Sequence, residues 1–144
     1  MSVVIITGSS GLVGSEAVSF FCNKGFDVIG VDNNLRNFFF GKDGSTLNIK
    51  KDLLKYNKNF FNYHIDIRNY QGLEKVFKKY KNNIALIIHC AAQPSHDYGK
   101  NFPYLDFNIN ATGTLNMLEL TKKYCPSSPF IFMSTNKVYG DNPN

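Results

Sequence analysis

The feature that most constrains the fold is a glycine-rich turn that follows a short β-branched run and opens a helical segment. Residues 2–7 are mostly apolar and too few for a helix, and three evenly spaced glycines follow them, Gly8, Gly11 and Gly14. From residue 12 to residue 24 apolar side chains recur at helical spacing, and Gly25 suits the C-terminal cap of that helix. This pattern predicts a buried parallel strand, a tight turn and a helix.

The rest of the chain alternates short apolar runs with segments of helical periodicity. Further strands are expected at residues 26–31, 60–65, 84–90 and 130–134, with helices at about 45–57, 69–80 and 104–124. Residues 33–44, and the segment that follows the fourth strand, are expected to be loops. Strands joined by helical crossovers run parallel, so residues 1–144 are predicted to form one α/β domain with a doubly wound parallel sheet in strand order 3-2-1-4-5.

The composition excludes several classes of protein. With 43% apolar and 19% charged residues, the 144-residue chain can bury a core without disulfides or a structural metal. Its apolar runs are far shorter than the ~20 residues of a membrane span, and its N-terminus lacks the pattern of a signal peptide, so no membrane contact and a cytosolic location are expected. The net charge of +5 arises mainly from lysines on helix faces, which favours solvated surfaces over a nucleic-acid interface. Three cysteines match no zinc pattern and are expected to be reduced core residues, so no metal site is expected at Cys22, Cys90 or Cys125.

Ligand-binding residues are expected beyond the carboxyl ends of the strands, where doubly wound sheets bind their ligands. In the turn, Gly8 permits a tight reversal, Gly11 lets a pyrophosphate approach the backbone, and Gly14 lets the helix pack close to the sheet. Asp32 ends the second strand, where a carboxylate accepts the two hydroxyls of an adenosine ribose and repels a 2′-phosphate. A turn without a ligand and a surface aspartate are the alternatives, but the combination predicts NAD as the cofactor rather than NADP.

Six segments together resemble the extended short-chain dehydrogenases/reductases, the NAD-dependent nucleotide-sugar epimerases and dehydratases. They are TGSSGLVG at 7–14, DNN at 32–34, DIR at 66–68, HCAAQ at 89–93, NATGTLN at 110–116 and STNKVYGD at 134–141. The resemblance implies a Rossmann fold, bound NAD, and a sugar carbon that is transiently oxidised and reduced. The last segment is most similar to the CDP-tyvelose (CDP-paratose) 2-epimerases, which implies a CDP-sugar substrate. Other sugar-nucleotide epimerases and dehydratases are the alternatives.

Position by position, the resemblance implies a role at each strand end. The amides of Leu12 and Val13 lie over the pyrophosphate, Asp32 holds the ribose, and Asp66 and Ile67 lie beside adenine. The loop from residue 91 to residue 93 passes the nicotinamide ribose. The complete set of implied cofactor-binding residues is Gly8, Ser10, Gly11, Leu12, Val13, Gly14, Asp32, Asn33, Arg36, Asp66, Ile67, Ala91, Ala92, Gln93 and Asn110.

The match to the family's active site is partial. Thr135 matches the catalytic Ser or Thr that hydrogen-bonds the reacting sugar hydroxyl, and Asn110 matches the active-site asparagine, with Asn108 as an alternative. The family's acid/base residue is a Tyr with a Lys four positions later, and none of the eight tyrosines in this chain has that Lys. The chain is therefore expected to be the cofactor-binding part of an epimerase, without the last strands and the sugar-binding part. A complementing C-terminal half or a homo-oligomer is the expected protein partner, and a non-catalytic NAD-binding or interaction module is the other hypothesis.

Two histidines and one aromatic run have more ordinary interpretations. His89 lies in a buried strand and is expected to be a core residue with hydrogen-bond partners, not a catalyst. His96 beside Asp97 suggests a hydrolase triad, but no nucleophile-elbow motif supports one. The run Phe38–Phe40 fits either loop packing or the rim of the cofactor site, and the sequence leaves both open.

Overall fold

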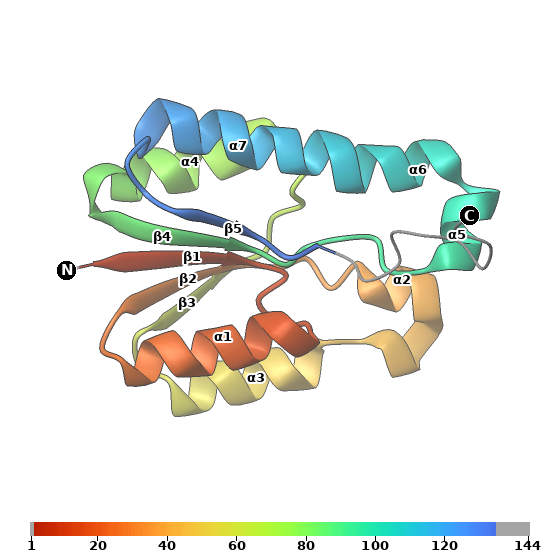
Figure 1. Cartoon of the computed structure of the whole chain (residues 1–144). Helices are drawn as coiled ribbons and strands as arrows, with labels where there is room; N and C mark the ends of the chain where they lie inside the picture. Colours follow the sequence, from red (N-terminus) through yellow and green to blue (C-terminus); the bar gives the residue numbers. More distant parts are fainter. Residues whose placement is uncertain (1, 135–144) are drawn as a thin grey trace, which may run out of the picture.

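A five-stranded parallel sheet forms the centre of the computed structural model, which describes residues 2–134 (Figure 1). Its strands are β1 (Val3–Thr7), β2 (Asp27–Val31), β3 (Phe60–Tyr63), β4 (Ile84–His89) and β5 (Phe130–Phe132). They lie in the order β3-β2-β1-β4-β5, and every neighbouring pair is parallel. The predicted α/β fold and strand order are therefore confirmed.

Helices cover both faces of this sheet. On one face lie α1 (Leu12–Asn23) and α3 (Leu47–Tyr56), and on the other lie α4 (Tyr70–Tyr80) and α7 (Gly113–Tyr124) (Figure 1). The side chain of Asn69 caps α4 by accepting a hydrogen bond from Gly72 N at 2.9 Å. The helix expected over residues 104–124 is made of three parts, since α6 (Pro103–Phe107) continues through a π-helical turn (Asn108–Thr112) into α7.

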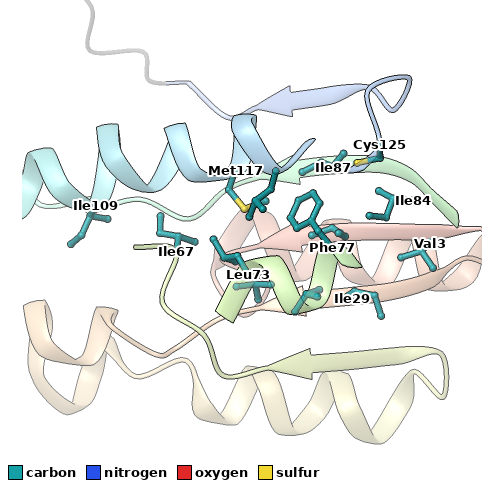
Figure 2. Packing of buried hydrophobic residues seen from close by; sticks show 14 residues of the cluster. Val3, Ile29, Ile67, Leu73, Phe77, Ile84, Ile87, Ile109, Met117 and Cys125 are labelled. Atoms are coloured by element: carbon teal, nitrogen blue, oxygen red, sulfur yellow. The ribbon is translucent and has the colours of Figure 1, made fainter. Parts of the chain in front are cut away.

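Strand β1 separates two apolar cores, one on each face of the sheet. Val3 and Ile5 belong to the core beneath α4 and α7, whose close packing Figure 2 shows around Phe77 and Met117. Val4 and Ile6 belong to the core beneath α1 and α3. Because successive side chains of a strand point to opposite faces, a strand covered on both sides needs apolar residues at every position. All five residues of β1 are buried accordingly.

Two segments expected to be loops contain short helices instead. Residues 33–44 include α2 (Arg36–Phe40) and a 3-10 turn (Gly41–Gly44), and α5 (His96–Asn101) follows β4. Gly41 ends α2 with a φ of +65°, and Asn34 Oδ1 closes the segment by accepting hydrogen bonds from Thr46 N at 2.7 Å and Thr46 Oγ1 at 3.1 Å. A helix of five or six residues has no room for an apolar period, so the sequence pattern could not reveal it.

The three cysteines are free thiols, as predicted. Cys22 and Cys125 are buried in the cores, and Cys90 is half-buried. Burial raises the pKa of Cys22 and of Cys90 to about 11. Across residues 2–134, no helix has both the length and the apolar character needed to cross a bilayer.

Candidate functional site

The glycine-rich turn between β1 and α1 has a shape that only glycine permits. Gly8 has a φ of +64°, and a Cβ at that position would lie 2.9 Å from Ala91 N. A Cβ on Gly14 would lie only 2.0 Å from Gly8 O, so α1 can approach the turn this closely only with glycine at position 14. Gly11 N donates to Gly8 O at 2.9 Å and closes the turn.

The first turn of α1 presents unpaired backbone amides to this region. Gly11 occupies the N-cap position without a capping side chain, and the first turn holds no acidic residue. The amides of the first helical residues, Leu12 to Gly14, have no partner within the helix. Since the helix dipole also places partial positive charge at this end, the turn favours an anion.

A cavity of about 280 Å³ opens in front of this turn, beyond the carboxyl ends of the strands. Its lining includes all of the predicted cofactor-binding residues except Ser10, Gln93 and Asn110. The sequence missed several further lining residues, which are Val31, Asn34, Leu35, Thr46, Ile65, Cys90, Pro94 and Ile109. Seven of these eight adjoin a predicted residue along the chain, whereas Thr46 has no such neighbour and reaches the cavity only through the fold.

Asp32 ties the end of β2 to the glycine-rich turn. Its Oδ2 accepts a hydrogen bond from Ser10 N at 3.0 Å, and its Oδ1 accepts one from Asn34 N at 2.8 Å. A carboxylate has about four acceptor positions, so two remain for a ligand. Ser10 contributes through its backbone, which explains why it supports the site without lining the cavity.

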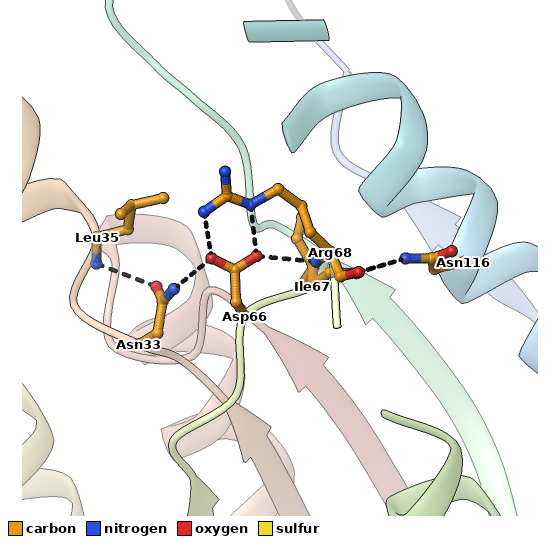
Figure 3. Close-up of polar contacts among 6 residues, drawn as sticks. All are labelled: Asn33, Leu35, Asp66, Ile67, Arg68 and Asn116. Carbon is orange, nitrogen blue, oxygen red and sulfur yellow. Dashed lines mark hydrogen bonds and ion pairs between the residues drawn. The ribbon is translucent and has the colours of Figure 1, made fainter. Parts of the chain in front are cut away.

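Asp66 is the centre of a hydrogen-bonded cluster that joins the loops after β2 and β3 (Figure 3). Arg68 binds it in a bidentate manner, with Nε 2.9 Å from Oδ1 and Nη2 2.7 Å from Oδ2. Arg68 N and Asn33 Nδ2 donate the remaining two hydrogen bonds, at 2.8 and 2.9 Å. Burial opposes ionisation of Asp66, but the hydrogen bonds from Arg68 and Asn33 outweigh it and lower its pKa.

This cluster bears on the role that the resemblance implies for Asp66. Its two oxygens accept four protein hydrogen bonds, which fill the acceptor positions of a carboxylate. An adenine amino group would therefore have to displace one of these donors. Asn116 Nδ2 donates to Ile67 O at 3.0 Å and fixes the neighbouring backbone (Figure 3). Ile67 itself lines the cavity as an apolar wall.

Gln93 and Asn110 do not line the cavity. They hydrogen-bond to each other and share Asp106 as a further partner. Gln93 N donates to Asn110 Oδ1 at 2.8 Å, and Gln93 Nε2 donates to Asp106 Oδ1 at 2.8 Å and to Ser95 O at 2.8 Å. Asn110 Nδ2 donates to the same Asp106 oxygen at 3.1 Å. Asn108 is exposed and bonds only within its own helix, to Thr112. Of the two candidate asparagines, Asn110 is the one that holds the loop after β4.

His89 has the structural role that the sequence predicts. It is buried, and burial lowers its pKa to about 4. The hydroxyl of Thr114 donates to Asn110 O at 2.6 Å, so its oxygen accepts from His89 Nε2, at 3.0 Å. The other ring nitrogen, Nδ1, then accepts from Thr7 Oγ1 at 2.7 Å. A neutral imidazole thus links the end of β1 to the first turn of α7.

Two further predictions concern a catalytic hydroxyl and a metal. Thr135 lies outside the described residues, so its catalytic role remains a prediction. Among residues 2–134, no three His, Cys, Asp or Glu side chains come together in a group that could hold a metal ion.

Comparison with known proteins shows where this chain belongs. The family model described as GDP-mannose 4,6 dehydratase matches residues 5–144. CDP-paratose 2-epimerase from Salmonella typhi is 36% identical over 138 residues, which cover 96% of this chain and 38% of the relative. UDP-glucuronate 4-epimerase from Thermodesulfobacterium geofontis (strain OPF15) is 33% identical over 144 residues, which cover 99% of this chain and 42% of the relative. The chain thus spans about two fifths of these relatives.

Solved structures agree with the sequence matches. UDP-glucose 4-epimerase from Bifidobacterium longum, in complex with NAD+ and UDP, superposes with a TM-score of 0.79 at 28% identity, over 96% of this chain and 38% of that one. A dTDP-glucose 4,6-dehydratase from Bacillus anthracis in complex with NAD gives a TM-score of 0.74 at 25% identity, over 97% of this chain and 39% of that one. The turn, the cavity and these matches together establish that the chain belongs to the NAD-dependent epimerase/dehydratase family of the extended short-chain dehydrogenases/reductases.

Proposed function

We propose that this chain is the NAD-binding part of a nucleotide-sugar epimerase, with the 2-epimerisation of a CDP-linked sugar as its specific reaction. The observation that carries the proposal is a carboxylate, Asp32, held beside an uncapped helix N-terminus at the mouth of one cavity. The similarity to a CDP-paratose 2-epimerase supports the choice of sugar. UDP-sugar epimerases of comparable similarity define the alternative substrates.

The residues around the cavity suit NAD chemically. The free amides of Leu12 and Val13 suit a pyrophosphate, and the two unused acceptor positions of Asp32 suit the hydroxyls of a ribose. Small side chains at Ala91 and Ala92 leave the opposite wall open for the nicotinamide ribose. The Asp32 carboxylate would repel a 2′-phosphate, which favours NAD over NADP.

The chemistry divides between the cofactor and the protein. When bound, NAD supplies the hydride acceptor and donor for a transient oxidation of the sugar carbon. The chain's part is to orient: Asp32 fixes the adenosine end, and the Gln93–Asn110 contact fixes the loop beside the nicotinamide end. Thr135 is proposed to hydrogen-bond the reacting hydroxyl. Removal of the proton from that hydroxyl requires a general base, a Tyr with a Lys four residues later, which a C-terminal half would supply.

A second candidate function is a non-catalytic NAD-binding module. Such a module needs only the features already described for binding, the Asp32 carboxylate and the uncapped N-terminus of α1, and no catalytic side chain. Both candidates bind NAD, so they differ only in turnover. The three free thiols suit a reducing compartment, and we place either protein in the cytosol.

The test combines binding and turnover. Titration with NAD(H) and NADP(H) should show saturable binding of NAD(H), and a chain that binds neither would refute both candidates. Turnover should then be measured with CDP-paratose and with UDP-glucose, using the chain alone and together with the C-terminal half of a related epimerase. Activity on the CDP-sugar only with the added half supports the epimerase, and NAD binding without turnover on any nucleotide sugar supports the module.

A further inference from the structure

Four aromatic rings join two short helices, α2 and α5, in segments that the sequence pattern predicts to be loops. Tyr98 of α5 lies with its ring centroid 5.0 Å from that of Phe39 and 5.9 Å from that of Phe38, both in α2. It also stacks on Phe102 at 5.0 Å, and the two phenylalanines of α2 contact each other at 5.5 Å. We call these four residues the aromatic bridge. Edge-to-face and stacked pairs of this kind are attractive beyond the area that they bury.

The aromatic bridge connects the two sides of the cavity. On one side, the loop after β2 lines the cavity from Asp32 to Arg36 and continues directly into α2. On the other side, the loop after β4 lines it from Cys90 to Pro94 and leads into α5. Figure 1 shows α2 and α5 next to each other beyond the carboxyl ends of the strands. The rings of the bridge therefore join the two walls outside the sheet, beyond the core cluster on which Leu35 and Ala91 both pack.

The base of each wall is fixed more firmly than its tip. Asn34 Oδ1 anchors the first wall to Thr46 through two hydrogen bonds. Gln93 anchors the second wall to Asp106 and Asn110. The bridge contains only apolar ring contacts, and Phe38 and Phe102 are 60% and 52% exposed. If the walls part, they part at the bridge, because contacts there can break without leaving a buried polar group unpaired.

We infer that the aromatic bridge is a gate for cofactor exchange, closed when its rings are in contact as the structure shows them and opened for the uptake and release of the dinucleotide. The inference rests on the proposed function, since it requires that NAD bind in the cavity. With the bridge closed, the cavity of about 280 Å³ is slightly smaller than the ~300–1,000 Å³ typical of ligand pockets. Because the bridge spans the two walls of this cavity, separation of the rings would widen the path by which a dinucleotide enters or leaves.

A gate makes a kinetic prediction that differs from that of an ordinary supporting contact. Tyr98→Ala removes three of the four ring contacts, and both the association and the dissociation rate constants of NADH should rise roughly tenfold, with little change in Kd. Tyr98→Phe keeps the ring and should exchange NADH at the wild-type rate. The rates are measured by stopped-flow NADH fluorescence, with excess NAD+ as the competitor for dissociation.

Phe20→Ala is the matched control. Phe20 is half exposed on α1 and forms an edge-to-face pair with Phe21 at 5.1 Å, outside the cavity lining. Its truncation should leave both rate constants unchanged. A Tyr98→Ala variant that accelerates only dissociation, or neither rate, overturns the gate and leaves the bridge a structural contact. Failure of the wild-type chain to bind NADH overturns the proposed function instead, so the two failures are distinguishable.

Discussion

Replacement of Asp32 by alanine tests the central contact of the proposed cofactor site. Each carboxylate oxygen accepts one protein hydrogen bond, from Ser10 N at 3.0 Å and from Asn34 N at 2.8 Å. Two acceptor positions remain, and these match the two hydroxyls of a ribose. Hydrogen bonds to charged groups contribute about 1.5–3 kcal/mol, so Asp32→Ala should weaken NAD binding by about 10- to 150-fold.

The assay is equilibrium titration of NADH fluorescence with the wild type, Asp32→Ala and Asp27→Ala. Asp27 begins the same strand, β2, at the end away from the cavity, so Asp27→Ala should bind NADH like the wild type. Thermal unfolding of both variants checks that the fold is intact. The reasoning about Asp32 is refuted if its variant binds NADH within twofold of the wild type, or if the wild type binds NADPH as tightly as NADH.

Three further predictions concern the core, the turn and turnover. Because the folded-state pKa of His89 is about 4 while the unfolded chain titrates near 6.5, stability is complete above pH 6.5 and falls by about 3 kcal/mol toward pH 4. Denaturant titrations should show this slope in the wild type and in His64→Gln but not in His89→Gln, and equal slopes in all three would contradict it. Gly14→Ala should cost at least about 1–3 kcal/mol of stability and weaken NAD binding, since its Cβ meets Gly8 O; unchanged unfolding and titration curves would exclude this clash. Residues 1–144 alone should show little or no epimerase turnover and poor solubility, and robust activity of a soluble monomer in a CDP-sugar assay would overturn that expectation.

The elements that the sequence predicts correctly are those whose signal is local. β1 is packed against a core on each face, so it needs the unbroken apolar run that the sequence shows. The turn after it needs glycines at fixed positions, and their spacing is also visible in the sequence. α2 and α5 are too short for periodicity, and their aromatic contact joins residues about sixty positions apart. The position of Gln93 in a motif predicts that it lies near the cofactor, whereas its hydrogen bond to Asp106 depends on where α6 lies. The periodicity of neighbouring residues does not show which distant residues come into contact.

Strand ends were predicted less accurately than strand centres. β3 ends at Tyr63 rather than Ile65, because Ile65 N turns back to bond Tyr63 O at 3.0 Å. β5 likewise ends two residues before its predicted limit. Side-chain character changes little across these ends, while the backbone direction changes abruptly.

The contact between Asn34 and Thr46 makes the segment between them a self-contained loop. Asn34 Oδ1 binds the backbone and the hydroxyl of Thr46, so the residues between them form a loop closed at its own base. That loop contains Arg36 and two residues of the aromatic bridge, Phe38 and Phe39. The glycine-rich turn, in contrast, directly follows β1, a strand buried on both faces. Substitution of Arg36, which lines the cavity and belongs to neither core, can therefore alter what the cavity accepts at its adenosine end, whereas Leu35 and Phe39 also pack on the core beneath α4 and α7. Residues 34–46 should therefore be exchangeable between relatives as one unit, because the Asn34–Thr46 contact that closes the loop is exchanged with it.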